Sequence, residues 1–151
     1  MEVDSSAPVI VEDSIEIRSD PKTIWDIISD FENWPSWNPE IKKVKLDGAF
    51  QVGNKFKWKA GSSTIRSELR AIEEPGILGW TGRTFGIQAV HIWNIVPIDG
   101  KVLVKTEESW NGLHVKIFSR YFKSLLEKSI KTGLEYLKIE AEKRSINDSA
   151  V

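Results

Sequence analysis

Residues 87–110, with the sequence IQAVHIWNIVPIDGKVLVKTEESW, contain the clearest β-hairpin pattern of the chain. Two long runs flank the dipeptide Asp99-Gly100, which is typical of a two-residue β-turn. The run from Ile87 to Val96 is apolar on both faces except for three polar residues, so we expect it in the centre of a sheet. The run after the turn alternates between apolar and polar residues, which indicates a strand with one buried face.

A turn at this dipeptide fixes which side chains lie opposite each other in the hairpin. Counting back from the turn pairs Trp93 with Thr106 and His91 with Glu108, all on the face that carries Trp110. One interpretation of the His91–Glu108 pair is a polar anchor, or an acid/base pair, inside an apolar cavity. The other is a structural hydrogen bond near the end of the sheet, because a buried polar group needs a partner.

Five further segments have the two-residue period of strands with one buried face. Glycines between the later segments indicate short turns, and consecutive strands with short turns form an antiparallel sheet. Together with the hairpin they predict a sheet of seven strands. The five segments are residues 9–18, 43–46, 55–60, 65–71 and 78–81.

Two short helices and one long helix complete the predicted fold. Pro21 follows Asp20, as at the start of a helix, and two prolines limit residues 31–39 to a short helical turn and bend. From Ile117 to Arg144 apolar residues recur every three or four positions, which predicts an amphipathic helix about 42 Å long. A sheet wrapped around one such helix is an α+β fold with a gap that can bind a ligand.

Composition restricts the function classes. The net charge is −1, without a basic excess, so we expect no nucleic-acid partner. The absence of cysteine removes disulfides, thiolate metal sites and cysteine nucleophiles. The two histidines lack the spacing of metal ligands, and we expect no metal and no cofactor. No run approaches 18 apolar residues and no signal peptide is visible, so we expect a cytoplasmic protein without a membrane span.

The ends of the chain differ from its middle. Residues 1–8 and 145–151 are small and polar, and we predict disordered tails there. Residues 9–144 contain no linker or repeat and are predicted to form a single ligand-binding domain, as a monomer or weak dimer.

Residues 25–39, with the sequence WDIISDFENWPSWNP, resemble the signature of the START-like (SRPBCC) superfamily, in its polyketide cyclase/dehydrase branch. Residues 91–95 look like the family's penultimate strand, and the resemblance covers about residues 9–143. It implies a helix-grip fold: a curved seven-stranded antiparallel sheet around a C-terminal helix, with two short helices after the first strand. It also implies a cavity for hydrophobic or amphipathic small molecules, and it supplies no universal catalytic residues.

The predicted ligand site combines inward-facing aromatic and aliphatic residues with the polar pair. Each aromatic residue could belong to the core or line the pocket. We expect the turn at residues 82–86 and the segment before the long helix to gate the site. The predicted ligand-contacting residues are Trp58, Leu69, Leu78, Trp80, His91, Trp93, Thr106, Glu108, Trp110, Phe118, Phe122 and Leu126.

Three functions follow from this interpretation. The first is binding or carriage of a lipid-like or aromatic ligand by desolvation against the aromatic residues, with His91 and Glu108 orienting a polar group. The alternative is a cyclase or dehydratase in which His91 acts as general base and Glu108 sets its tautomer. The third is a protein-interaction module, which predicts an exposed apolar patch and no sizeable cavity.

Overall fold

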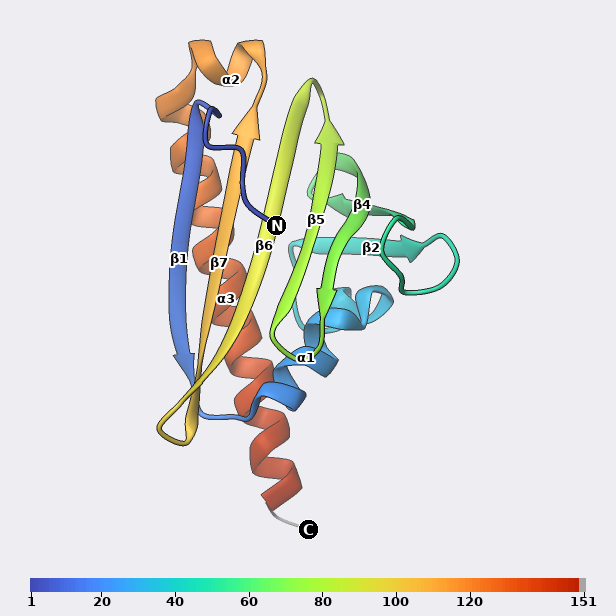
Figure 1. Ribbon diagram of the computed structural model, residues 1–151, viewed down its shortest axis with the longest axis vertical. Helices are drawn as coiled ribbons and strands as arrows, with labels where there is room; N and C mark the ends of the chain where they lie inside the picture. Colours follow the sequence, from blue (N-terminus) through green and yellow to red (C-terminus); the bar gives the residue numbers. More distant parts are fainter. Residues whose placement is uncertain (150–151) are drawn as a thin grey trace.

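The computed structural model describes residues 1–149 and contains one antiparallel sheet of seven strands (Figure 1). The spatial order is β1-β7-β6-β5-β4-β3-β2, so consecutive strands are neighbours except for β1, which pairs with β7. In the predicted hairpin, β6 lies next to β5 and β7 lies next to β1. The strands are β1 (Val9–Ile17), β2 (Ile41–Leu46), β3 (Lys55–Ala60), β4 (Ser63–Glu73), β5 (Ile77–Thr84), β6 (Ile87–Ile98) and β7 (Lys101–Asn111).

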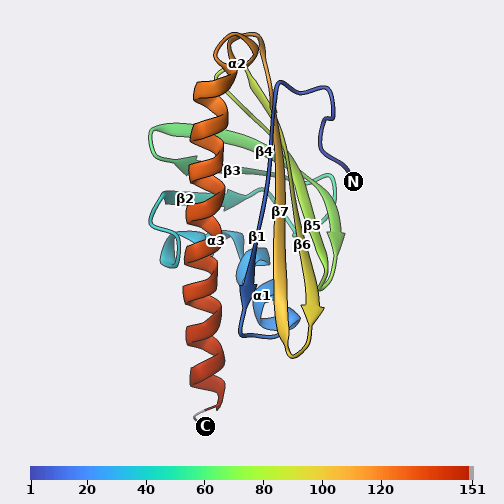
Figure 2. The same cartoon turned by 90° about the vertical axis from the view of Figure 1, so that its left-hand side faces the viewer.

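The helices are α1 (Pro21–Ser29), the 3-10 helix η1 (Phe31–Ser36), α2 (Leu113–Ile117) and α3 (Ser119–Ser149). At the start of α1, the side chain of Asp20 accepts a hydrogen bond of 2.9 Å from the backbone N–H of Thr23. Figure 2 shows α3 running along one face of the sheet beside β1 and β7, while β2 and β3 turn across its path. The sheet therefore curves around the helix, as the predicted helix-grip fold requires.

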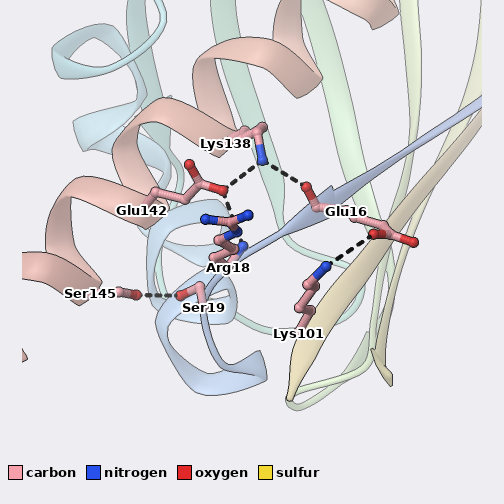
Figure 3. Close-up of polar contacts among 7 residues, drawn as sticks. All are labelled: Glu16, Arg18, Ser19, Lys101, Lys138, Glu142 and Ser145. Atoms are coloured by element: carbon pink, nitrogen blue, oxygen red, sulfur yellow. Dashed lines mark hydrogen bonds and ion pairs between the residues drawn. The ribbon is translucent and has the colours of Figure 1, made fainter. Parts of the chain in front are cut away.

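The C-terminal half of α3 is fixed to the sheet by apolar and polar contacts. Lys138 Nζ donates 2.9 Å and 2.6 Å hydrogen bonds to the backbone carbonyl of Glu16 and to Glu142 (Figure 3). The backbone N–H of Arg18 donates to the same carboxylate at 3.1 Å. The apolar side of the helix packs into the core at spacings of three and four residues. Its buried residues are Leu126, Ile130, Leu134, Leu137 and Ala141.

The hairpin prediction is confirmed residue by residue. Trp93 pairs with Thr106, and His91 pairs with Glu108. Asp99 and Gly100 have φ values of 40° and 77°, the left-handed conformation that a tight two-residue hairpin turn requires at both central positions. Because two residues close the turn, the register leaves the histidine and the carboxylate on the same face.

The long helix differs from its prediction at both ends. It begins at Ser119 rather than near Ile117, because the separate helix α2 precedes it and Phe118 between them has non-helical angles (φ −111°, ψ 41°). It continues to Ser149, past the predicted end at Arg144. Ser145 Oγ lies 2.8 Å from Ser19 Oγ, a contact that ties this last part of the helix to the start of α1.

The structure also places the two segments expected to be tails. The backbone N–H of Asp4 donates to Ser109 Oγ at 3.0 Å, and the Asp4 carboxylate accepts from Asn111 at 2.8 Å, so residues 1–8 lie against β7. Residues 145–149 are helical, and residues 150–151 of the predicted C-terminal tail lie outside the described residues. Side chains on β7 and in the turn before α1 thus hold the two segments.

Candidate functional site

Most of the predicted site residues lie in two neighbouring rows that cross the concave face of the sheet. The first row runs from Leu69 on β4 through Trp80 on β5 and His91 on β6 to Glu108 on β7. Antiparallel pairing places side chains at these opposed positions on one face of the sheet. The second row contains Leu78, Trp93 and Thr106.

A polar network lies at the β7 end of these rows. His91 Nδ1 is 3.3 Å from Glu108 Oε2, and His91 Nε2 is 2.7 Å from Thr106 Oγ1. The Trp110 indole N–H donates to the other carboxylate oxygen of Glu108 at 2.7 Å. The side chains of His91 and Glu108 are 12% and 14% exposed, so water has little access to either.

The environment of His91 determines its tautomer. Burial lowers the pKa of His91 below its usual value, although the nearby Glu108 carboxylate acts in the opposite direction, and we take the ring as neutral near pH 7. A neutral imidazole donates through one nitrogen and accepts through the other. The carboxylate can only accept, so the Glu108 oxygen 3.3 Å away favours a proton on Nδ1. Nε2 lies 2.7 Å from Thr106 Oγ1, whose hydroxyl also donates to the backbone carbonyl of Ile92 at 3.2 Å. Both nitrogens of His91 are therefore engaged by the protein.

Aromatic packing fills the part of the interior beside α1 and η1. Phe31 and Trp34 of η1 approach Phe56 and Trp80 on the sheet, with ring centroids 4.5 Å apart for Phe31–Phe56 and 5.5 Å for Trp34–Trp80. Trp80 in turn stacks beside His91, with centroids 4.8 Å apart. This half of the concave face is core, and it supports one side of the His91 ring.

Towards α2, the same face carries smaller side chains. The row next to His91 contains Ser67, Gly82 and Ala89, three residues with small or no side chains. Trp58 Nε1 donates to Ser67 Oγ at 3.1 Å from one side, and the Trp110–Phe122 pair, with centroids 6.3 Å apart, lies at the other end of the row. Half-buried apolar side chains surround this small-residue row. They are Trp58, Ile65, Ile87, Trp110 and Phe122.

The predicted ligand-contacting residues therefore fall into three groups. Six are buried: Leu69, Leu78, Trp80, Trp93, Thr106 and Leu126. Five are half-buried around the polar network or the small-residue row: Trp58, His91, Glu108, Trp110 and Phe122. The remaining residue, Phe118, is 59% exposed.

The prediction that Phe118 faces inward is wrong for a local reason. A continuous helix would place Phe118 one turn before Phe122 and on the same side. The backbone instead breaks between α2 and α3 at Phe118 and turns its ring towards solvent. Sequence reasoning also missed Ser67, Gly82 and Ala89, although their register positions place them on the inner face.

The segments predicted as gates lie side by side at the α2 end. The β5–β6 turn contains Phe85 and Gly86 with φ values of 44° and 75°. The turn packs closely on Gly112, the residue before α2. A Cβ atom at Gly112 would lie only 2.6 Å from the carbonyl oxygen of Gly86. Figure 1 shows the turn and α2 at the same end of the molecule.

The described residues also form two open grooves. One, of about 520 Å³, lies on the outer face of the sheet beside Met1, Arg70 and Glu73. The other, of about 420 Å³, lies between β1 and α3 and is lined mainly by charged residues such as Asp13 and Lys131. Neither contains the aromatic residues of the concave face, and neither matches the apolar cavity implied by the family resemblance.

Two further properties bear on the chemistry. Within residues 1–149, no group of three or more histidine, aspartate or glutamate side chains is placed to hold a metal ion. No helix in that part of the chain is long and apolar enough to cross a bilayer.

Comparison with known proteins agrees with this architecture. A START superfamily protein from Mycobacterium smegmatis is 19% identical, with a TM-score of 0.78 over 89% of this chain and 97% of that one. The ZhuI aromatase/cyclase from Streptomyces sp. R1128 is 13% identical, with a TM-score of 0.79 over 90% of this chain and 94% of that one. A hypothetical protein from Helicobacter pylori is 14% identical, with a TM-score of 0.81 over 91% of this chain and 90% of that one. At these identities the likeness shows the fold alone.

Sequence comparison gives a family rather than a near relative. No curated protein matches the chain. The family model described as polyketide cyclase/dehydrase and lipid transport matches residues 8–142, which include all seven strands and most of α3. This chain therefore belongs to the polyketide cyclase/dehydrase and lipid transport family.

Proposed function

We propose that this protein binds a small hydrophobic or amphipathic ligand at the α2 end of its concave face. The observation that carries the proposal is the small-residue row of Ser67, Gly82 and Ala89, which is surrounded by half-buried aromatic and aliphatic side chains. Covering such surface with an apolar ligand is favourable by about 25 cal/mol per Å² removed from water. The family's description includes lipid transport, which supports the same ligand class.

The polar network gives the proposed site one specific contact. One oxygen of Glu108 accepts a hydrogen bond from the Trp110 indole N–H, and the other lies 3.3 Å from His91 Nδ1. A carboxylate oxygen has a second acceptor position. A ligand hydroxyl or amine can therefore donate to Glu108 while its apolar part covers Ala89 and Phe122, which makes an amphipathic ligand a better match than a pure hydrocarbon.

Binding without catalysis agrees better with the state of His91. A general base needs a free nitrogen within reach of the proton that it removes. Here Nδ1 lies against Glu108 and Nε2 against Thr106, so base catalysis would first require one of these two contacts to be given up. An enzymatic role remains the second candidate because one similar structure is described as an aromatase/cyclase.

The experiment is a binding titration with anilinonaphthalene sulfonate, an amphipathic fluorescent probe, on wild-type protein and two variants. Ala89→Phe fills the small-residue row, and Gln88→Phe adds the same ring on the opposite face of the same strand. We expect Ala89→Phe to weaken binding about tenfold or more and Gln88→Phe to bind like wild type. Equal binding by all three proteins, or absence of binding by wild type, would contradict the proposal. Native mass spectrometry of freshly purified protein then identifies any ligand retained from the cell.

A further inference from the structure

Exposed apolar side chains gather at one end of the molecule, around α2. We call this cluster the apical patch; it combines the tip of the β5–β6 turn with residues from α2 to the first turn of α3. Figures 1 and 2 both show these elements together at the same end. The members are 59–77% exposed and are Phe85, Leu113, Ile117, Phe118 and Tyr121.

The elements that carry the apical patch are in contact with one another. The β5–β6 turn touches α2 directly, because a Cβ on Gly86 would lie 3.1 Å from the His114 ring. His114 and Tyr121 both pack edge-on against Phe122, with centroids 5.4 Å and 5.3 Å away. Phe122 thus supports the patch from below while its neighbours remain in solvent. Soluble monomers rarely expose such a cluster unless something binds it.

The segments that build the apical patch carry basic but no acidic side chains. Four exposed basic residues lie within or beside the patch: Arg83, Lys116, Arg120 and Lys123. None of them forms an ion pair among residues 1–149. The segments that build the patch, residues 75–98 and 109–126, contain no aspartate or glutamate. Asp4 lies near the end of β7, and its carboxylate already accepts hydrogen bonds from Asn111 and Ser6.

We propose that the apical patch docks on the surface of a bilayer that contains anionic lipids. Aromatic and aliphatic side chains enter the boundary between headgroups and acyl chains, and the flanking basic residues attract the anionic headgroups. The four basic residues without ion-pair partners match the uniform negative charge of such a bilayer surface. Docking needs no ligand in the concave face, so this inference stands independently of the proposed function.

Docking would have a consequence for the site. The small-residue row with Ala89 lies near the end of the molecule that carries the patch, since the β5–β6 turn follows Gly82 and precedes Ala89 by a few residues. A protein bound through Phe85 and Ile117 would therefore hold that end of the concave face near the acyl chains.

The test is flotation of the full chain with phosphatidylcholine vesicles, with and without phosphatidylserine. Two double variants remove the two parts of the surface: Leu113→Ser with Ile117→Ser, and Lys116→Glu with Arg120→Glu. Ile139→Ser is the matched apolar control, because Ile139 is 63% exposed on α3 away from the patch. Lys128→Glu is the charge control, since Lys128 is exposed further along the same helix.

We expect wild type and both controls to float with phosphatidylserine vesicles, and both double variants to lose about tenfold or more of this binding. Wild-type binding should weaken as salt is added. The proposal is overturned if wild type fails to float, if phosphatidylcholine alone binds it equally well, or if the controls lose as much as the patch variants. It is also overturned if the patch captures a protein while wild type ignores both kinds of vesicle. Unchanged circular dichroism and thermal unfolding show that each variant is folded.

Discussion

The two ends of α3 are held in very different ways. Near its C-terminus, Leu134, Leu137 and Ala141 are buried, and Lys138 and Glu142 bind the backbone at the end of β1 (Figure 3). Near its N-terminus, the helix starts after a backbone break and exposes aromatic side chains to solvent. The C-terminal half of the helix therefore stabilises the fold, whereas the first turn carries exposed side chains that are available for binding.

The largest expected difference between the two ends concerns stability. Leu137 is fully buried, whereas Leu125, near the first turns of the same helix, is 45% exposed. Replacing a buried leucine by alanine removes apolar contact and leaves a cavity, so Leu137→Ala should lower the free energy of unfolding by about 2–5 kcal/mol. Leu125→Ala should lower it by less than about 1 kcal/mol. Denaturant unfolding measures the free energy of unfolding of both variants. Equal losses would show that the two ends of α3 contribute equally to stability.

His91 lies between the aromatic core and the small-residue row of the concave face, and its titration tests its burial there. Because the folded protein lowers the pKa of His91 below the unfolded value of 6.5, the unfolded state binds a proton first as pH falls. The contribution of His91 to the free energy of unfolding is therefore fully present above pH 6.5. It declines as the pH falls from 6.5 towards the lower pKa of the folded state. The slope should not exceed about 1.4 kcal/mol per pH unit.

Urea unfolding between pH 8 and pH 5 measures this effect, with His91→Gln as the comparison. Glutamine can still hydrogen-bond to Glu108 or Thr106 but takes up no proton. We expect the variant to lose less stability than wild type over that range. An identical decline in both proteins would show that His91 is not the group responsible.

A smaller effect is expected from the polar contacts at the fixed end. The pKa of Glu142 is lowered because Lys138 donates a hydrogen bond to it, with a further contribution from the backbone N–H of Arg18. The stabilisation that Glu142 gives the fold is therefore present above pH 4.5 and is lost on further acidification. Both side chains are partly exposed, and Glu142→Gln should cost about 0.5–1 kcal/mol near pH 7. Glu127→Gln, on an exposed glutamate of the same helix, should cost almost nothing. Thermal unfolding at low salt measures the change in melting temperature of both variants. Equal changes would show that the contacts of Glu142 with Lys138 and Arg18 do not stabilise the fold.

The hairpin could be predicted closely because its turn leaves little freedom. Two residues at Asp99-Gly100 permit one register, and strand parity then places His91 opposite Glu108. The short hydrogen bond between His91 and Thr106 could not be predicted in the same way, because it joins neighbouring rows and depends on the side-chain rotamers.

The start of α3 shows why the rest of the site was harder to predict. The apolar period continues through Ile117, Phe118 and Phe122, so the pattern alone favours one helix. The actual break depends on α2 packing against Gly86 in a distant turn, which is a tertiary contact. The filling of the interior by Phe31 and Trp34 likewise depends on how η1 docks on the sheet.

We propose that ligand binds at the small-residue row, beside the N-terminal end of α3, while the C-terminal end of the helix remains fixed. Hydrogen exchange followed by mass spectrometry, with and without saturating anilinonaphthalene sulfonate, tests it most directly. We predict that the probe slows exchange in the β5–β6 turn, α2 and residues 119–126, and leaves residues 134–142 unchanged. Protection confined to residues 134–142, or equal protection along the whole of α3, would contradict the account.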